Sequence, residues 1–295
     1  MHIKTPDMGA FFLRKDLTKR IYSIKRLAAM PHVLTRLLSA LATPDVSINK
    51  LSEIIENDQA LTAKVLSLAN SAFYGFSQEV TTIKRAATLI GMHELELLAL
   101  GAGFGDFFNM KKTPERFNGR ALWQHCLAVS WLSKELATVT GSFSPSEVMV
   151  AGLLHDLGKL VLICHLKEEM EEVLALTDQG VSPHEAERRL GVEHTRIGAL
   201  LARRWNLPAL LQEAIAKHHN PTPSDPFYAS TSLVFLGDYM AHKLGFGLAA
   251  PPKGAEPDGH FKANQLNQIN LKPLLNKAKE NVPDRLQMVG IMVTI

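Results

Sequence analysis

Helical periodicity is the feature that most constrains this chain. In segment after segment, apolar residues recur every three or four positions, a spacing that places them on one face of a helix. The stretch at 31–45 does so with Leu34, Leu37, Leu38 and Leu41. No stretch longer than four residues alternates convincingly with the period of two that a half-buried strand requires. The sequence therefore predicts an all-α fold of many helices.

Helix-terminal signals mark where several segments begin and end. Ser47, Ser144 and Ser182 each precede a helical segment and predict N-caps. Pro and Glu follow Ser144 and Ser182 at the first and third helical positions, as in capping sequences. Gly91 predicts a helix C-terminus, and the helical pattern that begins at 59 is expected to end near Gly75.

A polar, apolar-poor stretch at 109–118 predicts a link between two lobes. We expect an N-terminal helical lobe at 1–110 and a second lobe, with a C-terminal extension, at 111–295. The Gly- and Pro-rich stretch at 245–261 predicts a surface loop. The apolar end at 284–295 fits either a short helix or a strand.

Composition excludes several classes of protein. The chain has 295 residues, of which 46% are hydrophobic and 21% charged, and its net charge is +3, ordinary values for a globular protein. Cys126 and Cys164 match neither a disulfide framework nor a paired metal motif, which predicts a reducing compartment. There is no signal-peptide core, and no apolar run approaches the roughly 18 residues of a membrane span. We expect a cytoplasmic protein without membrane contact.

Polar groups inside one apolar segment raise the question of what holds them. The stretch AGLLHDLGKLVL at 151–162 carries His155, Asp156 and Lys159 in the middle of a predicted buried helix. Burying such groups without partners costs several kcal/mol each. A metal ion would hold His155 and Asp156 without an unpaired charge, because imidazole and carboxylate are ligands for Fe, Mn, Zn or Ni.

Similar groups recur in the second predicted lobe, within or at the ends of apolar helices. The candidate metal ligands are His125, His155, Asp156, His194, His218, His219 and Asp238. Simpler explanations stay open for single members: Asp156 pairs with Lys159 one turn later, and His218 and His219 favour a helix C-terminus. His125 also fits a hydrogen-bonded core histidine. Other histidines are weaker candidates: His32, His93, His165, His184, His242 and His260.

Several motifs, taken in order, resemble the HDOD domain family. The most distinctive are DQALTAKVLSLANSAFYG at 58–75 and TTIKRAATLIGMHELELLAL at 81–100. ALWQHCLAVS, AGLLHDLGKLVL and GVEHTRIGALLARRWNLPALLQEAIAKHHNP follow in the family's order. The resemblance covers residues 20–245 and implies an HDOD-type fold, in which an N-terminal helical lobe packs on an HD-like helical lobe.

This family is similar to the HD phosphohydrolase superfamily and is nearest to its HD-GYP branch. By that resemblance, metal-ligand positions are occupied by His125, His155, Asp156, His194, His218, His219 and Asp238. It implies a divalent metal site of up to two ions, with Fe or Mn expected ahead of Zn or Ni. It also implies catalytic-type roles for two residues: Asp156 would bridge two metals, and Lys159 would meet a substrate phosphate.

Two departures from the HD-GYP pattern weaken the expectation of cyclic di-GMP cleavage. Ala121 stands where trinuclear members carry a glutamate one helical turn before the first histidine. The chain reads HHNPTPSDPFYA at 218–229, without the Gly-Tyr-Pro signature of the enzymes. Residues 1–110 also lack an obvious catalytic constellation.

Three functions compete on these grounds. The first is a bacterial signalling or regulatory output module that keeps an HD-type metal site and acts on a protein partner. The second is a metal-dependent phosphohydrolase or phosphodiesterase acting on a cyclic dinucleotide or nucleotide. The third is nucleic-acid binding through the basic stretch at 14–26, for which a solvated helix face is the preferred explanation. We expect the first, with a nucleotide or phosphate ligand and without nucleic acid.

Overall fold

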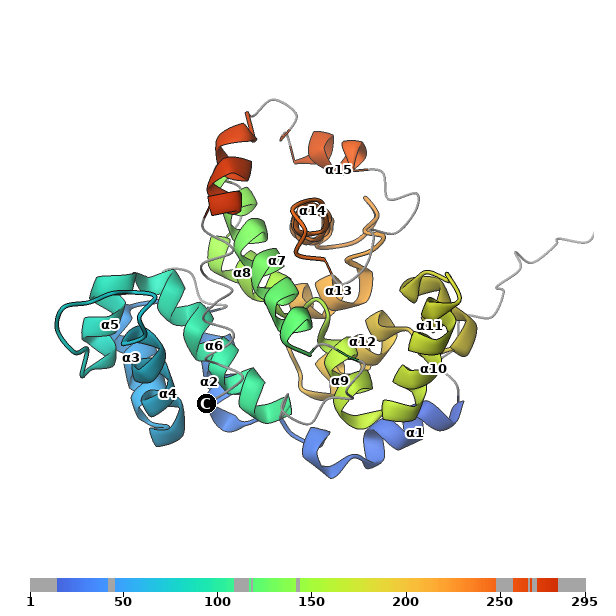
Figure 1. The fold of residues 1–295 in the computed structure, drawn as a ribbon, viewed down its shortest axis with the longest axis horizontal. Helices are drawn as coiled ribbons and strands as arrows, with labels where there is room; N and C mark the ends of the chain where they lie inside the picture. The colour runs from blue at the N-terminus through green and yellow to red at the C-terminus, as the bar shows by residue number, and fades with distance from the viewer. Residues whose placement is uncertain are drawn as a thin grey trace, which may run out of the picture.

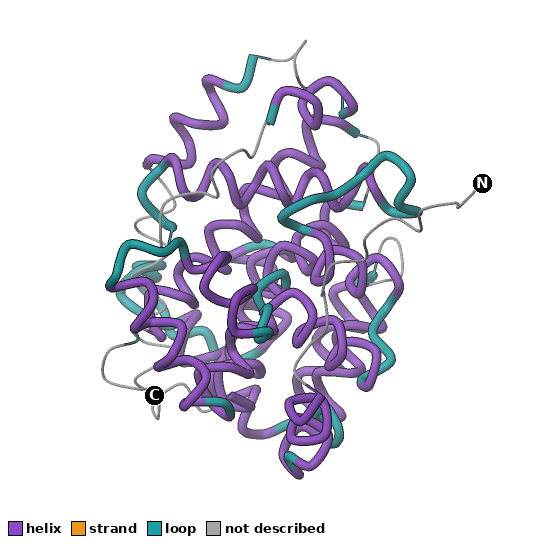
Figure 2. Tube along the Cα trace, turned by 90° about the vertical axis from the view of Figure 1, so that its right-hand side faces the viewer, coloured by secondary structure: helices purple, strands orange, loops and turns teal. Residues whose placement is uncertain are grey.

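The fold is built from helices joined by short connections. The computed structural model describes residues 15–41, 46–108, 117, 119–141, 144–247, 257–264, 266 and 270–280. No strand occurs among these residues, which confirms the predicted all-α class (Figure 2).

The N-terminal part of the described chain contributes six α-helices and one 3₁₀ helix. In chain order they are α1 (Lys15–Ser23), the 3₁₀ helix η1 (Lys25–Leu27), α2 (His32–Leu41), α3 (Ile48–Glu56), α4 (Gln59–Ala69), α5 (Ile83–Ile90) and α6 (Met92–Phe108). Figure 1 shows α2 to α6 as one group on the left. Their apolar stripes face inward, and Leu34, Leu37 and Leu51 are fully buried there.

The remaining helices form the larger part of the molecule (Figure 1). They are α7 (Gly119–Thr140), α8 (Pro145–Leu154), α9 (Leu157–His165), α10 (Lys167–Asp178), α11 (Pro183–Leu190), α12 (His194–Arg204), α13 (Ala209–Lys217), α14 (Tyr228–Lys243) and α15 (Asp258–Ala263). A further helical segment spans 272–280. The long helices α7 and α14 pack on each other and on α8.

Helix α1 and the 3₁₀ helix η1 pack on the larger part of the molecule, and Figure 1 shows α1 beside α10. Arg20 forms an ion pair with Glu169 of α10. The Trp205 indole donates a hydrogen bond to the Leu27 carbonyl at 3.1 Å, and Arg204 donates to the Ile21 carbonyl at 3.2 Å. Part of the expected 1–110 lobe therefore rests on helices of the expected 111–295 lobe.

The predicted helix caps are present. The side chains of Ser47, Ser144 and Ser182 accept hydrogen bonds from the backbone N–H three residues on, at 3.2, 3.4 and 3.4 Å. Gly91 ends α5 with a φ of 91°, in the region that favours glycine. The helix ends predicted from these four residues are therefore confirmed.

Helix α4 ends earlier than the sequence pattern predicts. The last helical residue is Ala69, and Asn70 follows it as the C-cap. The Asn70 side chain accepts a hydrogen bond from the Val80 N–H at 2.7 Å and donates to the carbonyls of Val80 and Leu66 at 2.8 and 2.9 Å. These bonds fold residues 70–80 back on the helix end, so the helix does not continue to Gly75.

Some expectations fall partly or wholly outside the described residues. Only 245–247 and 257–261 of the expected loop are described, and α15 begins inside it at Asp258. Most of the expected link at 109–118, and the whole apolar end at 284–295, lie outside the described part.

The buried segment at 151–162 is two helices rather than one. Helix α8 ends at Leu154 and α9 begins at Leu157, so His155 and Asp156 lie at the junction. Asp156 occupies the N-cap position of α9, but its side chain makes no capping hydrogen bond. Its carboxylate is therefore available to other partners.

The same region contains a segment with the length and hydropathy of a membrane span. Among the described residues, Pro145–His165 is long and apolar enough to cross a membrane, and 83% of its apolar window is buried inside the fold. Such burial is typical of a core segment in a globular protein.

Helices α9 and α12 approach each other closely at two glycines. A Cβ on Gly158 would overlap the backbone carbonyl of His194, and a Cβ on Gly198 would lie 3.0 Å from the Gly158 nitrogen. Only glycine therefore fits at position 158 without a shift of the backbone. The approach places His194, the first residue of α12, beside the α8–α9 junction.

Candidate metal centre

The helices bring all seven predicted ligands to one place in the core. His125 lies on α7, His155 and Asp156 lie at the α8–α9 junction, His194 begins α12, His218 and His219 follow α13, and Asp238 lies on α14. Six of these residues are less than 5% exposed, and His219 has 16% of its side chain exposed. Their donor atoms separate into two groups that share Asp156.

The first donor group contains His125 Nε2, His155 Nε2, Asp156 Oδ2 and Asp238 Oδ1. His125 Nε2 lies 3.3 Å from His155 Nε2, 3.6 Å from Asp156 Oδ2 and 3.2 Å from Asp238 Oδ1. His155 Nε2 lies 3.3 Å from Asp156 Oδ2. Two ligand atoms about 2.1 Å from a common ion are about 3.0 to 3.4 Å apart in octahedral or tetrahedral geometry, so this spacing suits a single ion.

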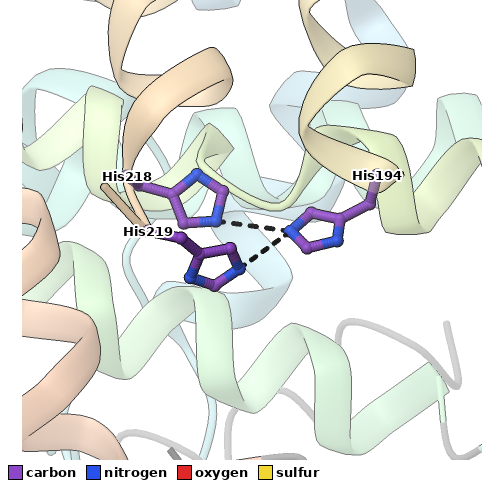
Figure 3. A group of neighbouring side chains, drawn as sticks. All are labelled: His194, His218 and His219. Atoms are coloured by element: carbon purple, nitrogen blue, oxygen red, sulfur yellow. Dashed lines mark hydrogen bonds between the residues drawn. The ribbon is translucent and has the colours of Figure 1, made fainter. Parts of the chain in front are cut away.

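The second donor group contains His194 Nε2, His218 Nε2, His219 Nε2 and Asp156 Oδ1. His194 Nε2 lies 3.4 Å from His218 Nε2 and 3.1 Å from His219 Nε2 (Figure 3). Asp156 Oδ1 lies 3.4 Å from His194 Nε2 and 3.7 Å from His218 Nε2. The two oxygens of Asp156 thus face different donor groups, as a bridging carboxylate requires.

Backbone carbonyls fix the tautomers of the first donor group. The Nδ1 atom of His125 donates to the Phe246 carbonyl at 3.0 Å, and that of His155 donates to the Gly152 carbonyl at 2.7 Å. A carbonyl oxygen only accepts, so Nδ1 carries the proton in each ring. In the neutral ring, Nε2 then presents a bare lone pair to the centre of the group.

Two histidines of the second donor group have the same arrangement. His218 Nδ1 donates to the Ala214 carbonyl at 3.1 Å, and His194 Nδ1 donates to the Glu187 carboxylate. Glu187 also accepts from the His194 backbone N–H at 2.9 Å. Metal-binding histidines are typically held in this way by a carbonyl or carboxylate behind the ring.

Several donor atoms of the two groups lack hydrogen-bond partners. Two bare Nε2 atoms at 3.3 or 3.4 Å cannot donate to each other. Oxygen Oδ1 of Asp156 and Oδ1 of Asp238 are buried and accept no hydrogen bond, a state that is costly in a core. Because nitrogen and oxygen donors with these spacings are what Fe, Mn, Zn or Ni bind, the described residues fit a divalent metal centre.

Burial and neighbouring charges set the protonation states. Burial alone would raise the pKa of Asp156, but the His155 and Lys159 charges hold it well below its usual range. Burial, together with neighbouring imidazoles, lowers the pKa values of His218 and His219 well below the ordinary histidine value. The carboxylate is therefore ionised and these two imidazoles are neutral, which are the forms that bind metals.

The simpler pairing of Asp156 with Lys159 is also present. Lys159 Nζ donates to Asp156 Oδ2 at 2.8 Å. It leaves Asp156 Oδ1 without a hydrogen bond, and it does not account for the facing Nε2 atoms of His194 and His218. The pairing therefore explains one oxygen of the carboxylate and not the cluster.

Two residues near the cluster were not selected from the sequence. Glu187 holds His194 from behind, and no sequence spacing signals this because the two residues belong to different helices. His242 Nε2 lies 3.3 Å from Asp238 Oδ1. Their separation of four positions on one helix, which places both on the same face, was a usable signal.

A cavity of about 170 Å³ opens beside the two donor groups. Its lining includes Lys159, His194 and His219 as well as the apolar Met170 and Val173 of α10. A small ligand in this cavity would meet both polar donors and apolar side chains.

Comparisons with known sequences agree with the fold and its motifs. A sequence model of the HDOD domain family matches residues 27–221. An uncharacterized protein from Treponema pallidum (strain Nichols) is 29% identical over 211 residues, which cover 70% of this chain. The match spans only 40% of the length of that curated relative.

Solved structures share the same architecture. A proposed signal transduction protein from Marinobacter aquaeolei VT8 has a TM-score of 0.77 at 22% identity, covering 90% of this chain and 59% of that chain. An HDOD domain protein of unknown function from Geobacter sulfurreducens has a TM-score of 0.66 at 25% identity, covering 90% and 99%. A proposed phosphohydrolase from Shewanella amazonensis SB2B has a TM-score of 0.65 at 24% identity, covering 95% and 98%.

Proposed function

Because the chain belongs to the HDOD domain family, we propose that it is a signalling or regulatory module that holds two divalent metal ions. The observation that carries the proposal is the position of Asp156. Its two oxygens face separate donor groups, at 3.3 Å from His155 Nε2 and 3.4 Å from His194 Nε2. A carboxylate shared in this way is the arrangement of two-metal sites.

The proposed metals are Fe or Mn. Each donor group offers imidazole nitrogens and one or two carboxylate oxygens, without a thiolate. Mixed nitrogen and oxygen sites suit these ions, whereas thiolate-rich sites select Zn. His155, His194 and Asp156 would be ligands, and the bound ions would supply positive charge for an anionic ligand.

The proposed ligand is a phosphate-bearing small molecule such as a nucleotide. Lys159 lines the cavity together with His194 and His219, and Met170 and Val173 offer apolar contacts for a base. A Lys ammonium and two metal ions are suitable partners for phosphate oxygens. A ligand bound in this cavity would act on α9, α12 and α14 together. These helices would then transmit the signal to a protein partner.

The proposal is tested by metal-dependent thermal unfolding. Added Mn²⁺ should raise the Tm of the wild type, because binding to the folded state alone stabilises it. Asp156→Asn should lose this response, since it removes the shared charge. Asp58→Asn is the matched control, because Asp58 caps α4 and asparagine caps as well. A wild-type Tm that ignores Mn²⁺ and Fe²⁺ would contradict the proposal.

A metal-dependent phosphohydrolase or phosphodiesterase is the second candidate function. It is favoured by the ion pair of Lys159 with the shared carboxylate of Asp156 at the edge of a cavity. The metal-loaded chain should then release product from mononucleotides or cyclic dinucleotides, and Asp156→Asn should not. Absence of product from every one of these substrates would leave the regulatory function alone.

Two broader expectations belong to the same proposal. The division into lobes at 1–110 and 111–295 would place the whole metal centre in the second lobe. A cytoplasmic location would supply the reducing conditions that keep Fe²⁺ and the thiols of Cys126 and Cys164 reduced.

A further inference from the structure

His242 lies beside the metal centre but outside both donor groups. Its Nε2 atom is 3.3 Å from Asp238 Oδ1, and its ring centroid is 5.2 Å from that of His125. Its side chain is only 10% exposed, and it lines the same cavity as Lys159. It is therefore a nearly buried imidazole with a buried carboxylate beside it.

The contact between His242 and Asp238 leaves buried atoms without hydrogen bonds. Asp238 Oδ1 accepts no hydrogen bond, although both His125 and His242 approach it, and His242 Nδ1 has no partner. A hydrogen bond to Oδ1 would offset part of the free energy that it costs to bury this oxygen. Two imidazole nitrogens at 3.2 and 3.3 Å from one carboxylate oxygen have the spacing of ligands around a common ion.

The loop after α14 holds the two imidazoles on either side of Asp238. The Phe246 carbonyl accepts the Nδ1–H of His125 at 3.0 Å. The next residue, Gly247, lies against the His242 ring, and a Cβ there would overlap His242 Nδ1. The loop thus fixes His125 by a hydrogen bond and His242 by direct packing.

The three side chains fit one ion. One donor atom from each of His125, Asp238 and His242 lies within 4.8 Å of the other two. Asp238 and His242 are four positions apart on α14, so a rigid helix sets their spacing. The Asp238 carboxylate adds an oxygen donor to the two imidazole nitrogens.

We propose that His242 is a metal ligand, on the Asp238 side of the centre, for the ion that His125 and Asp238 hold. This inference rests on the metal centre proposed above and adds a nitrogen donor from α14 to it. The bound metal is a divalent first-row ion, since imidazole with carboxylate is the donor pair that such ions prefer.

The test is metal affinity and the visible spectrum of the Co²⁺-loaded chain. His242→Gln keeps an amide that can hydrogen-bond Asp238, but it replaces the imidazole nitrogen. We expect at least one bound equivalent to lose tenfold or more in affinity, and the Co²⁺ d–d absorption to change. His32→Gln is the control, because His32 is exposed at the start of α2, and it should match the wild type.

Each other outcome overturns the assignment. Wild-type affinity and an unchanged Co²⁺ spectrum in His242→Gln would show that His242 is no ligand. Weak binding in His242→Ala that glutamine restores, spectrum included, would make His242 a positioning residue for Asp238. A wild-type chain without any bound ion would overturn the metal centre as a whole, which distinguishes the two failures.

Discussion

The Nε2 atoms of His125 and His155 face each other at 3.3 Å inside the core, while the Nδ1 atom of each ring donates to a backbone carbonyl. Two neutral rings in this arrangement present two lone pairs to each other, so the pair requires a cation. Without metal, that cation is a proton: burial alone would lower the pKa of His155, but the Asp156 carboxylate raises it. A divalent ion would replace this proton.

Metal binding should therefore release a proton at about pH 6.5. A raised pKa means that His155 is more than half protonated at its ordinary value of 6.5, and binding must remove that proton. The apparent affinity should consequently rise with pH through this range. Calorimetric titration with Mn²⁺ in two buffers of different ionisation enthalpy measures the release. Equal enthalpies in both buffers would contradict the raised pKa.

Glu187→Gln should weaken metal binding without removing a ligand. Glu187 accepts hydrogen bonds from both the ring and the backbone of His194, and loss of such a partner costs about 10- to 100-fold in affinity. Competition with a chelator measures this change. Glu185→Gln is the control, because Glu185 lies on the same helix and pairs only with exposed arginines. Equal affinities in the two variants would rule out the role given to Glu187.

Gly158→Ala should destabilise the fold strongly. The new Cβ would overlap the His194 carbonyl, and overpacking of this kind costs about 1 to 3 kcal/mol or more. Gly105→Ala, with no atom within 4 Å of its Cβ, should be neutral or stabilising by up to about 1 kcal/mol. Denaturant unfolding of both variants tests the difference, and equal stabilities would contradict the close approach of α9 and α12.

Asn70→Ala should reduce stability by about 1 to 3 kcal/mol, because it removes both partners that Val80 finds at the end of α4. Asn57→Ala, at the exposed C-cap of α3, should stay within about 0.5 kcal/mol of the wild type. The free energy of unfolding distinguishes the two. If Asn70→Ala left the free energy of unfolding unchanged, residues 70–80 would fold without this side chain.

Helix ends were predictable from sequence where the cap acts on its own neighbours. Ser144 and Ser182 each bond the N–H three residues on, so the relevant contact is local. Asn70 acts on Val80, ten positions away, and the predicted helix there was too long. The helix break at His155 and Asp156 was also missed, because the apolar pattern continues across it.

The candidate ligands were predictable as residue types but not as two groups. Motif order selected His125 and His194, yet only the packing of α7, α9, α12 and α14 places the oxygens of Asp156 in different groups. His242 was set aside although Asp238 lies four positions before it on the same helix, and its contact with His125 is visible only when α14 lies against α7. The metal-binding roles of the candidate ligands stay predictions.

Elemental analysis of the chain, purified without chelator or metal-binding tag, measures directly whether the centre holds metal. We expect about two divalent ions per chain, Fe or Mn, as in other shared-carboxylate sites. We also expect their loss in Asp156→Asn while Asp58→Asn keeps them. A folded chain that contains no stoichiometric metal, and takes up none from added Fe²⁺ or Mn²⁺, would contradict the proposed metal centre. The facing nitrogens of His125 and His155 would then be held together by a proton alone.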